Sequence, residues 1–516
     1  MLRVRLSPRA IATRNLQRGA ALVYGLFMLI IALAALFFLF NAGQLTAEKT
    51  RLVNTADAVA WSGGVLHARA LNTTAYLNRA LVANEVLIAQ SISLQSWSRM
   101  MAGRAETISR RVFPECADRT GRGQLASAAL RFGPDYVLMC SALSLPGVTP
   151  SVIAATEALD LGVASAIAGI EVNKASIQAA QVLLHAPSTF QSIRADVLRE
   201  VAQRNYDGMG EVRVEGAGAT LAGLSGLTDG WQGAVQRRSG DERARFAEVV
   251  RAAVAPDDFV RDRRWTSSAV VPHPICITRR NEVRRRGGTE LVDFDTWQAA
   301  DTESWWLATL RRWRCTHREV VAIGGGAASA EGSAPAEGAD AGGDEDAASV
   351  PLGAAAIGRT GPMAVGGASE NRMAWNRALR AEASTRSSAY TGLPGFHEIS
   401  EELLGRPDGD PRLDFSIRVV RARGELPVSG GRSAIAPGER INSYDTAAAG
   451  DEFAAVAASQ VYFARPPDHQ DNQYAVRAHG SHAQELASLF NPFWQVRLID
   501  LPADSAAQRL RQARGF

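Results

Sequence analysis

A run of apolar residues near the N-terminus constrains this chain more than any other feature. Residues 20–40 read AALVYGLFMLIIALAALFFLF, and no charged side chain occurs between Arg18 and Glu48. About 20 apolar helical residues span the hydrocarbon core of a bilayer, so the run is long enough to cross a membrane. Each Leu, Ile, Val or Phe in it favours insertion by about 0.3–0.6 kcal/mol. We therefore expect one membrane-spanning helix and a large body on one side.

The charges that flank the run predict its orientation. Residues 1–18 contain several arginines and no acidic residue, whereas Glu48, Lys49 and Arg51 follow the run as a weaker basic flank. The flank with more Lys and Arg stays in the cytoplasm. This predicts a cytoplasmic basic leader over residues 1–18 and an exported body.

Two processing alternatives remain open. A secretory signal has an apolar region of about 7–15 residues, shorter than this one, although the small residues 41–43 could accept a signal peptidase. Type IV prepilins, as a family, are cleaved after a glycine that ends a basic leader, and Gly19 precedes the helix at Ala20 in this way. Prepilins usually have Glu at the fifth position after the cut, where this chain has Tyr24. We therefore favour an uncleaved anchor over either cleavage.

The residues around the run carry a family resemblance. The step Arg18-Gly19 opens the helix, and the segment Arg51–Ala60, RLVNTADAVA, continues it beyond the apolar part. This pattern resembles the N-terminal domain of the TadE/TadG-like membrane proteins of Tad, or Flp, pilus-assembly systems, over residues 19–65. Some long members of that group carry a metal-dependent adhesion domain with a D-x-S-x-S motif.

The resemblance implies a function and a location. It implies a structural or assembly component of a Flp (Tad) type pilus or related secretion system, single-pass in the bacterial inner membrane with its body in the periplasm. Its partners would be the membrane and other pilus-assembly membrane proteins, with neither nucleic acid nor a small-molecule substrate. Ala21 and Gly25 have the small-xxx-small spacing that brings membrane helices together, although the same face could simply meet lipid.

The remainder of the chain changes character along its length. Helical periodicity continues after the run, with a break predicted near Ser62-Gly63-Gly64, and Pro187 should divide a later helical stretch in two. A long stalk and a separate folded-back helix are both compatible with this pattern. Short β-type runs and several tryptophans follow. A later segment rich in Ala, Gly, Ser, Glu and Asp has too few bulky apolar residues to order itself.

These changes predict an α+β fold in consecutive regions. A single N-terminal transmembrane helix continues into a helical stalk, then a mixed α+β periplasmic body with a disordered insertion. After the leader, the regions are a Tad-like transmembrane domain (19–65), a mainly helical region (66–204), a mixed α/β region (205–323), a low-complexity linker (324–358) and a C-terminal β-containing region (359–516). We expect strands on both sides of the linker to share one sheet.

The four cysteines are Cys116, Cys140, Cys276 and Cys315. An even number in an oxidising compartment favours disulfides, and sequence neighbourhood suggests pairing the first with the second and the third with the fourth. Four cysteines allow three connectivities, so this pairing is one of several. His273 and His317 lie beside the second pair, which leaves a tetrahedral zinc site as the competing interpretation.

Motifs for catalysis or cofactors are incomplete. Neither Lys49 nor Lys174 follows a phosphate-binding loop, and residues 223–226, GLSG, lack the second glycine of a nucleophile elbow. His397-Glu398 begins like the zinc motif H-E-x-x-H, but its fifth position is Glu401. His479 and His482 lie three apart without a third ligand. We expect no enzyme activity, cofactor or metal.

One near-match concerns the adhesion motif. Asp414-Phe415-Ser416-Ile417-Arg418 begins like D-x-S-x-S but ends in a cation, where Mg²⁺ requires oxygen. The alternative to an assembly role is a membrane-anchored periplasmic enzyme acting on envelope polymer, which would need titratable groups brought together by the fold.

The formal net charge of the whole protein is only +3, which gives no strong attraction to nucleic acid. Basic residues nevertheless cluster in the middle of the chain. Arg279-Arg280 and Arg284-Arg285-Arg286 form one cluster, and Arg311, Arg312 and Arg314 surround Trp313 in another. Such clusters can bind anionic lipid, polysaccharide or nucleic acid. A solvated face whose Arg stems cover Trp rings is the more ordinary interpretation.

Overall fold

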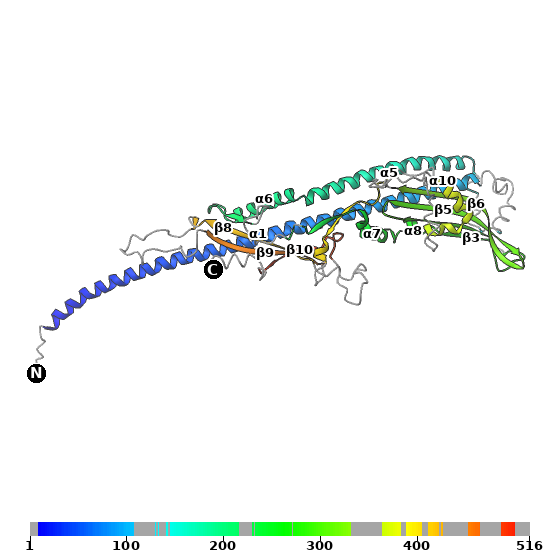
Figure 1. Ribbon diagram of the computed structural model, residues 1–516. Coiled ribbons are helices and arrows are strands. Elements are labelled where there is room, and N and C mark those ends of the chain that lie inside the picture. The colour runs from blue at the N-terminus through cyan, green and yellow to red at the C-terminus, as the bar shows by residue number, and fades with distance from the viewer. Residues whose placement is uncertain are drawn as a thin grey trace, which may run out of the picture. The chain divides into compact units, whose positions relative to one another are not determined.

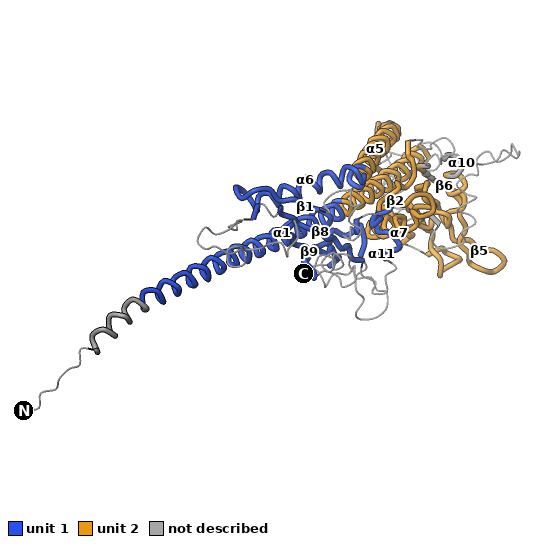
Figure 2. The backbone as a smooth tube through the Cα atoms, turned by 60° about the vertical axis from the view of Figure 1, so that its left-hand side comes forward, with its two compact units in different colours: residues 1–73, 183–236, 399–516 blue, residues 74–182, 237–398 orange. Residues whose placement is uncertain are grey.

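The computed structural model divides the chain into two compact units (Figure 2). Unit 1 contains residues 1–73, 183–236 and 399–516, and unit 2 contains residues 74–182 and 237–398. The regions expected from the sequence are consecutive, whereas each unit combines segments that are far apart in the chain. The structure describes residues 9–107 (side chains from 21), 130, 133, 141–142, 145–215, 230–231, 233–270, 272–331, 364–382, 389–404, 411–422, 425–426, 452–464 and 487–500.

The N-terminal part of the chain is one helix, α1, Arg9–Thr107, of 99 residues (Figure 1). Proline is absent from residues 9–113, and abundant Ala and Leu favour the helix. The predicted break at residues 62–64 is wrong, because α1 runs through these residues without interruption. The alternative of a separate folded-back helix is wrong for the same reason.

Unit 1 contains a four-stranded antiparallel sheet. Its strands are β1 (Arg213–Glu215), β8 (Leu413–Ala422), β9 (Glu452–Phe463) and β10 (Trp494–Ile499), in the order β1-β8-β9-β10. Helix α6 (Pro187–Asn205) shares a buried core with the sheet and the adjoining part of α1. In that core, alternate residues of β8 such as Phe415 and Ile417 contact small and aliphatic residues of α1 such as Ala56 and Val59.

Two glycines of α1 lie where this sheet meets the helix backbone. A Cβ atom at Gly63 would overlap the ring of Phe415, and one at Gly64 would overlap Val496 and Ser459. Glycine inside a helix costs about 1 kcal/mol relative to alanine. Close packing of helix against sheet offsets that cost, which explains why the helix continues through a pair of residues that predicts a break.

Unit 2 contains a second four-stranded antiparallel sheet, in the order β3-β4-β5-β6. Its strands are β3 (Trp265–Ser268), β4 (Glu282–Leu291), β5 (Thr296–Arg311) and β6 (Arg314–Glu331). The helical elements are α5 (Val148–His185), continuing into unit 1, η2 (Gly240–Arg243), α7 (Ala244–Val254), α8 (Asp258–Arg261), η3 (Ala364–Glu370) and α10 (Arg372–Glu382). Trp305 of β5 and Val283 of β4 form a small core with Ala105 of α1.

Strand β6 corrects the predicted start of the low-complexity linker. The linker was expected from residue 324, but β6 continues to Glu331 and pairs with β5 over this stretch. A Cβ at Gly326 would overlap the backbone carbonyl of Ser96 in α1, whose hydroxyl donates to the Gly326 carbonyl (3.3 Å). The small residues that suggested disorder allow the strand to approach the helix. Residues 332–358 lie outside the described part of the chain.

The remaining elements test two further predictions. Two short strands, β2 (Val235–Arg238) and β7 (Phe396–Ile399), pair with each other, and α11 (Glu401–Leu404) follows. Helices α5 and α6 meet at Pro187, which confirms the predicted division. Strands from both sides of the low-complexity segment share the sheet of unit 1, as expected, but β3–β6 all precede that segment and form a sheet of their own.

Candidate functional site

The apolar part of α1 is not buried within the protein. The most apolar 18-residue window has a mean hydropathy of 2.8, and 0% of it is buried within the protein. Leu22 is 74% exposed and Leu39 is 70% exposed, and most large apolar side chains between them are exposed as well. A continuous exposed apolar surface marks a site of contact with a membrane or another protein. By length and composition, this segment could cross a membrane.

The predicted contact and processing residues lie on this exposed segment. Ala21 is exposed, and a Cβ at Gly25 would have no described atom within 4 Å. Gly19 and Ala20 are helical, and their side chains lie outside the described part. The structure therefore brings no partner to the small-residue pair, and both the helix contact and cleavage after Gly19 remain predictions.

Unit 1 holds the first charged residues that follow the apolar run. The Glu48 side chain is 1% exposed and forms an ion pair with Arg421, which is also buried. Burial raises the pKa of Tyr206, and the neighbouring Glu48 carboxylate raises it further. Lys49 Nζ donates to the carbonyl oxygen of Ala454 (2.8 Å). The exposed apolar segment therefore ends before Glu48, and the folded part of unit 1 begins within about two helical turns of it.

Within unit 2, a second long apolar helix, α5, lies antiparallel to α1 (Figure 1). Polar pairs that join them include Arg99 Nε to Asp160 Oδ1 (3.1 Å), Asn173 Nδ2 to Asn84 Oδ1 (3.0 Å) and Gln181 Nε2 to Asn78 Oδ1 (2.7 Å). Helix α5 is also apolar and long enough to cross a membrane, with a mean hydropathy of 1.5. Its buried face nevertheless includes Thr156, Lys174 and Gln181, so the helix contacts unit 2 largely through polar groups.

A buried charge pair lies at the centre of these contacts. Lys174 Nζ is 2.6 Å from Glu85 Oε1, and the two side chains are 2% and 0% exposed. Trp297 Nε1 and the Tyr390 hydroxyl each donate to Glu85 Oε2 at 2.9 Å. Burial raises the pKa of Glu85, and the Lys174 ammonium opposes that rise. The same ammonium donates to the carbonyl oxygen of Gly392 (2.8 Å).

Sequence reasoning did not identify this cluster. The available signal was the presence of Asn78, Asn84 and Glu85 beside apolar residues at helical spacing, which indicates polar groups on a buried face. Their partners are distant in sequence, and no local pattern identifies them. Every described polar contact of Glu85 comes from a different element, so the cluster joins α1, α5, β5 and the loop before β7.

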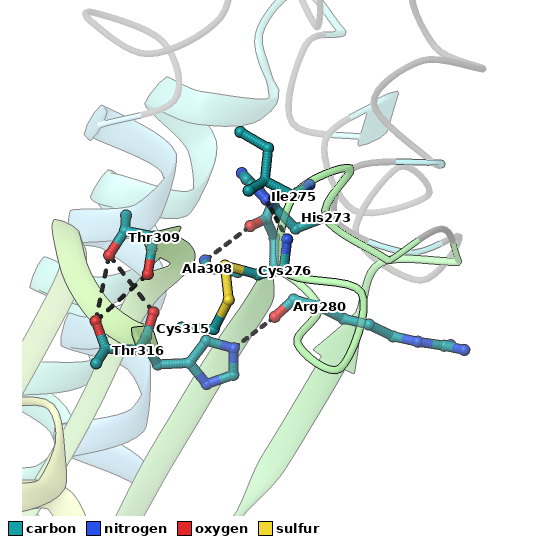
Figure 3. Close-up of a disulfide and its surroundings, with 10 residues drawn as sticks. His273, Ile275, Cys276, Arg280, Ala308, Thr309, Cys315 and Thr316 are labelled. Atoms are coloured by element: carbon teal, nitrogen blue, oxygen red, sulfur yellow. Dashed lines mark hydrogen bonds between the residues drawn. A yellow bond between two sulfur atoms is a disulfide. The ribbon is translucent and has the colours of Figure 1, made fainter. Parts of the chain in front are cut away.

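The structure joins Cys276 and Cys315 in a disulfide with a Cα–Cα distance of 5.6 Å (Figure 3). This pairing leaves no thiolate for the competing zinc interpretation. His273 Nδ1 accepts from the backbone N–H of Cys276 (3.2 Å), and His317 Nε2 lies 2.6 Å from the carbonyl oxygen of Arg280. Cys116 and Cys140 lie outside the described residues, so their pairing remains a prediction.

The other incomplete motifs have ordinary structural surroundings where they are described. Ser416 is buried in β8, and Arg418 pairs with Glu215 and Glu452 rather than leaving room for a metal. Burial lowers the pKa of His397 to about 4. Among the described residues, no group of three or more His, Cys, Asp and Glu side chains could hold a metal ion. Residues 223–226, His479 and His482 are outside that part of the chain.

These features define a protein with an exposed apolar N-terminal helix that continues into the cores of two mixed α/β units. Residues 19–70 match the Tad family model, described as "Putative Flp pilus-assembly TadE/G-like". The chain therefore carries a TadE/G-like domain at its N-terminus, which confirms the resemblance seen in the sequence. No curated protein and no solved structure matches the chain.

Proposed function

We propose that this protein is an inner-membrane-anchored structural or assembly component of a Flp (Tad) type pilus or a related secretion system. It acts through protein–protein contacts and carries out no catalytic step. One observation carries the proposal: the segment that matches the pilus-assembly domain, residues 19–70, contains the apolar part of α1 that no described residue covers. The domain match supports a pilus-related role, and the exposed apolar helix would anchor the protein in the membrane.

The proposed topology has one span, over residues 20–40, with the N-terminus in the cytoplasm and both units in the periplasm. Arginines concentrate before the span, in agreement with the distribution of positive charge across bacterial membranes. The Cys276–Cys315 disulfide suits an oxidising compartment. Helix α5 is not a second span in this proposal, because Lys174 and Gln181 would lose their partners in α1 if α5 left unit 2.

The matched domain also extends beyond the span into the core of unit 1. Leu52, Ala56 and Val59 are fully buried there against β8 and α6. A force or displacement applied to the membrane helix would therefore act directly on the core of unit 1, since α1 continues from the span into that core without interruption. This continuity supports a mechanical or scaffolding role over a role as a tethered enzyme.

Substitutions in the span test the contact mechanism. Ala21 and Gly25 lie on one face of the helix, and Val23 and Ala34 lie on the opposite face. We expect A21L/G25L to prevent pilus assembly in the source bacterium while the protein is still exported at its normal level. The matched control V23L/A34L adds bulk on the other face and should assemble pili normally. Normal piliation by A21L/G25L would refute contact through this face.

Sidedness and the mature N-terminus form a second test. We expect the intact mass of the purified protein to be that of the full-length chain. We also expect protease added to spheroplasts to digest both units. Protection of the units by the inner membrane would refute the topology. A mature chain that begins at Ala20 would instead identify a pseudopilin-like subunit, to be sought in the fibre itself.

A further inference from the structure

The hairpin between β5 and β6 ends in a turn whose sequence does not suit its conformation. Arg311 pairs with Arg314, so Arg312 and Trp313 form a two-residue loop. Their φ angles are 47° and 65°, in the left-handed region that such loops usually fill with Asn-Gly. Bulky residues there cost of order 1 kcal/mol or more each. The residues at this turn therefore serve something other than the stability of the hairpin.

The Trp313 side chain takes no part in packing, since it is 94% exposed. The exposed fraction of Leu310, on the strand that leads to the turn, is 45%. An aromatic ring held in water in this way loses the burial that normally stabilises tryptophan in a fold. Its exposure points to contact with a partner.

The disulfide brings more apolar residues to the same place. Cys315 follows the turn directly, and its bond to Cys276 holds the loop before β4 against the hairpin (Figure 3). Ile275 and Ile277, on either side of the buried Cys276, are 65% and 75% exposed. We call the exposed residues around this disulfide the hairpin tip surface: Ile275, Ile277, Arg279, Leu310, Arg311, Arg312, Trp313 and Arg314.

The charge of the hairpin tip surface is all positive. Its four arginines are exposed, and within the described part of the chain none of them forms an ion pair. Residues 269–281 and 307–318 contain no Asp or Glu. Some other exposed arginines of unit 2 do have a neighbouring carboxylate, as Arg261 has Asp258 and Arg264 has Asp262. The surface is therefore complementary to an anionic partner.

We propose that the hairpin tip surface binds an anionic lipid bilayer. A bilayer interface is suited to both halves of the surface: lipid phosphates attract the guanidinium groups, and the zone beneath them accommodates Trp, Ile and Leu side chains. An anionic polysaccharide or an acidic polypeptide would satisfy the arginines but would leave the protruding aliphatic side chains in water. The strained turn holds Trp313 at the point that would enter the interface first.

Vesicle binding by the full-length protein tests this proposal. The protein is reconstituted in phosphatidylcholine nanodiscs, so that the N-terminal helix is already in lipid. It is then mixed with separate vesicles of phosphatidylcholine, with or without 30 mol% phosphatidylglycerol, and bound protein is measured by flotation. We expect binding to the anionic vesicles only, weakening as salt increases. An equal affinity for both kinds of vesicle, or no binding to either, would overturn the proposal.

Variants separate binding from folding. R311Q/R312Q/R314Q should weaken binding by about 100-fold, since each interfacial arginine contributes roughly a factor of five. R312N/W313G gives the turn its preferred residues, so the protein should melt at the same or a higher temperature while vesicle affinity falls by about tenfold or more. The matched control R199Q/R204Q/R261Q removes three exposed arginines elsewhere and should bind normally.

Two outcomes would reject the assignment even if the wild type binds. One is an equal loss of binding in the control and tip variants, which would indicate nonspecific charge attraction. The other is equally tight binding to soluble polyglutamate, unchanged in R312N/W313G, which would identify a general polyanion site without a role for the apolar residues.

Discussion

Removal of Lys174 should expose how strongly unit 2 depends on its buried charge pair. In K174M the Glu85 carboxylate, 0% exposed, would lose the ammonium 2.6 Å away. It would keep the hydrogen bonds from Trp297 and Tyr390, at 2.9 Å each. Leaving one partner of a buried ion pair uncompensated costs about 3–5 kcal/mol. We expect a loss of this size at pH 7, corresponding to a fall in melting temperature of about 10 °C.

The loss should depend on pH in a defined direction. Burial already raises the pKa of Glu85, and removal of Lys174 takes away the group that opposes this rise. An acid whose pKa is raised by folding contributes stability when protonated and loses that contribution as pH increases through its folded pKa. The difference between K174M and the wild type should therefore shrink from pH 7 to pH 5. The double variant E85Q/K174M, without either charge, should recover part of the stability at pH 7.

The chain offers a matched control, because Lys49 is the only other lysine. Its ammonium donates to the carbonyl oxygen of Ala454, a neutral acceptor, so K49M should cost about 1 kcal/mol. Thermal unfolding in detergent gives the totals, and hydrogen exchange of α5 peptides shows that the loss is in unit 2. A cost below 1 kcal/mol for K174M, a cost independent of pH, or an equal cost for K49M would refute this reasoning.

Three further perturbations have expected outcomes. G63A should lower the stability of unit 1 by about 1–3 kcal/mol, because the added methyl group would overlap Phe415 of β8. G43A, where the methyl group would meet no described atom, should raise helix stability by up to about 1 kcal/mol. Equal effects of the two variants in urea unfolding would contradict the packing. C276S/C315S, which opens a loop with a sequence separation of 39, should cost about 4 kcal/mol, and a melting temperature equal to that of the oxidised wild type would argue against the bond. Burial holds the pKa of His397 at about 4, so stability should fall as pH decreases from about 6.5 to 4, and H397Q should remove that slope in denaturant titrations.

Several predictions from the sequence held because they depend on local chemistry. Pro187 ends one helix and begins another because its ring fixes φ and its nitrogen cannot donate. The predicted pairing of Cys276 with Cys315 required only that two segments close in sequence come into contact. The match of residues 19–70 to the pilus-assembly family model likewise depends only on the order of residues in one continuous stretch of chain.

The failures share a cause: small residues were interpreted by their own propensities. Gly63 and Gly64 predicted a break, and the glycine- and alanine-rich start of the supposed linker at residue 324 predicted disorder. In both places the absence of side-chain bulk lets another element approach, a sheet against helix α1 in the first case and helix α1 against strand β6 in the second. Secondary-structure propensity describes an isolated segment. The stabilisation from close packing depends on the neighbouring element, which the segment's own sequence does not specify.

The sequence by itself determined the apolar helix, its flanking charges and its resemblance to a pilus-assembly domain, because each is a property of consecutive residues. Only the tertiary structure decided that α1 remains one helix to Thr107, that Glu85 is paired with Lys174, and that Trp313 stands exposed on a strained turn. The physical reason is that burial and ion pairing depend on distances between atoms. Folding sets those distances between residues that the chain keeps far apart.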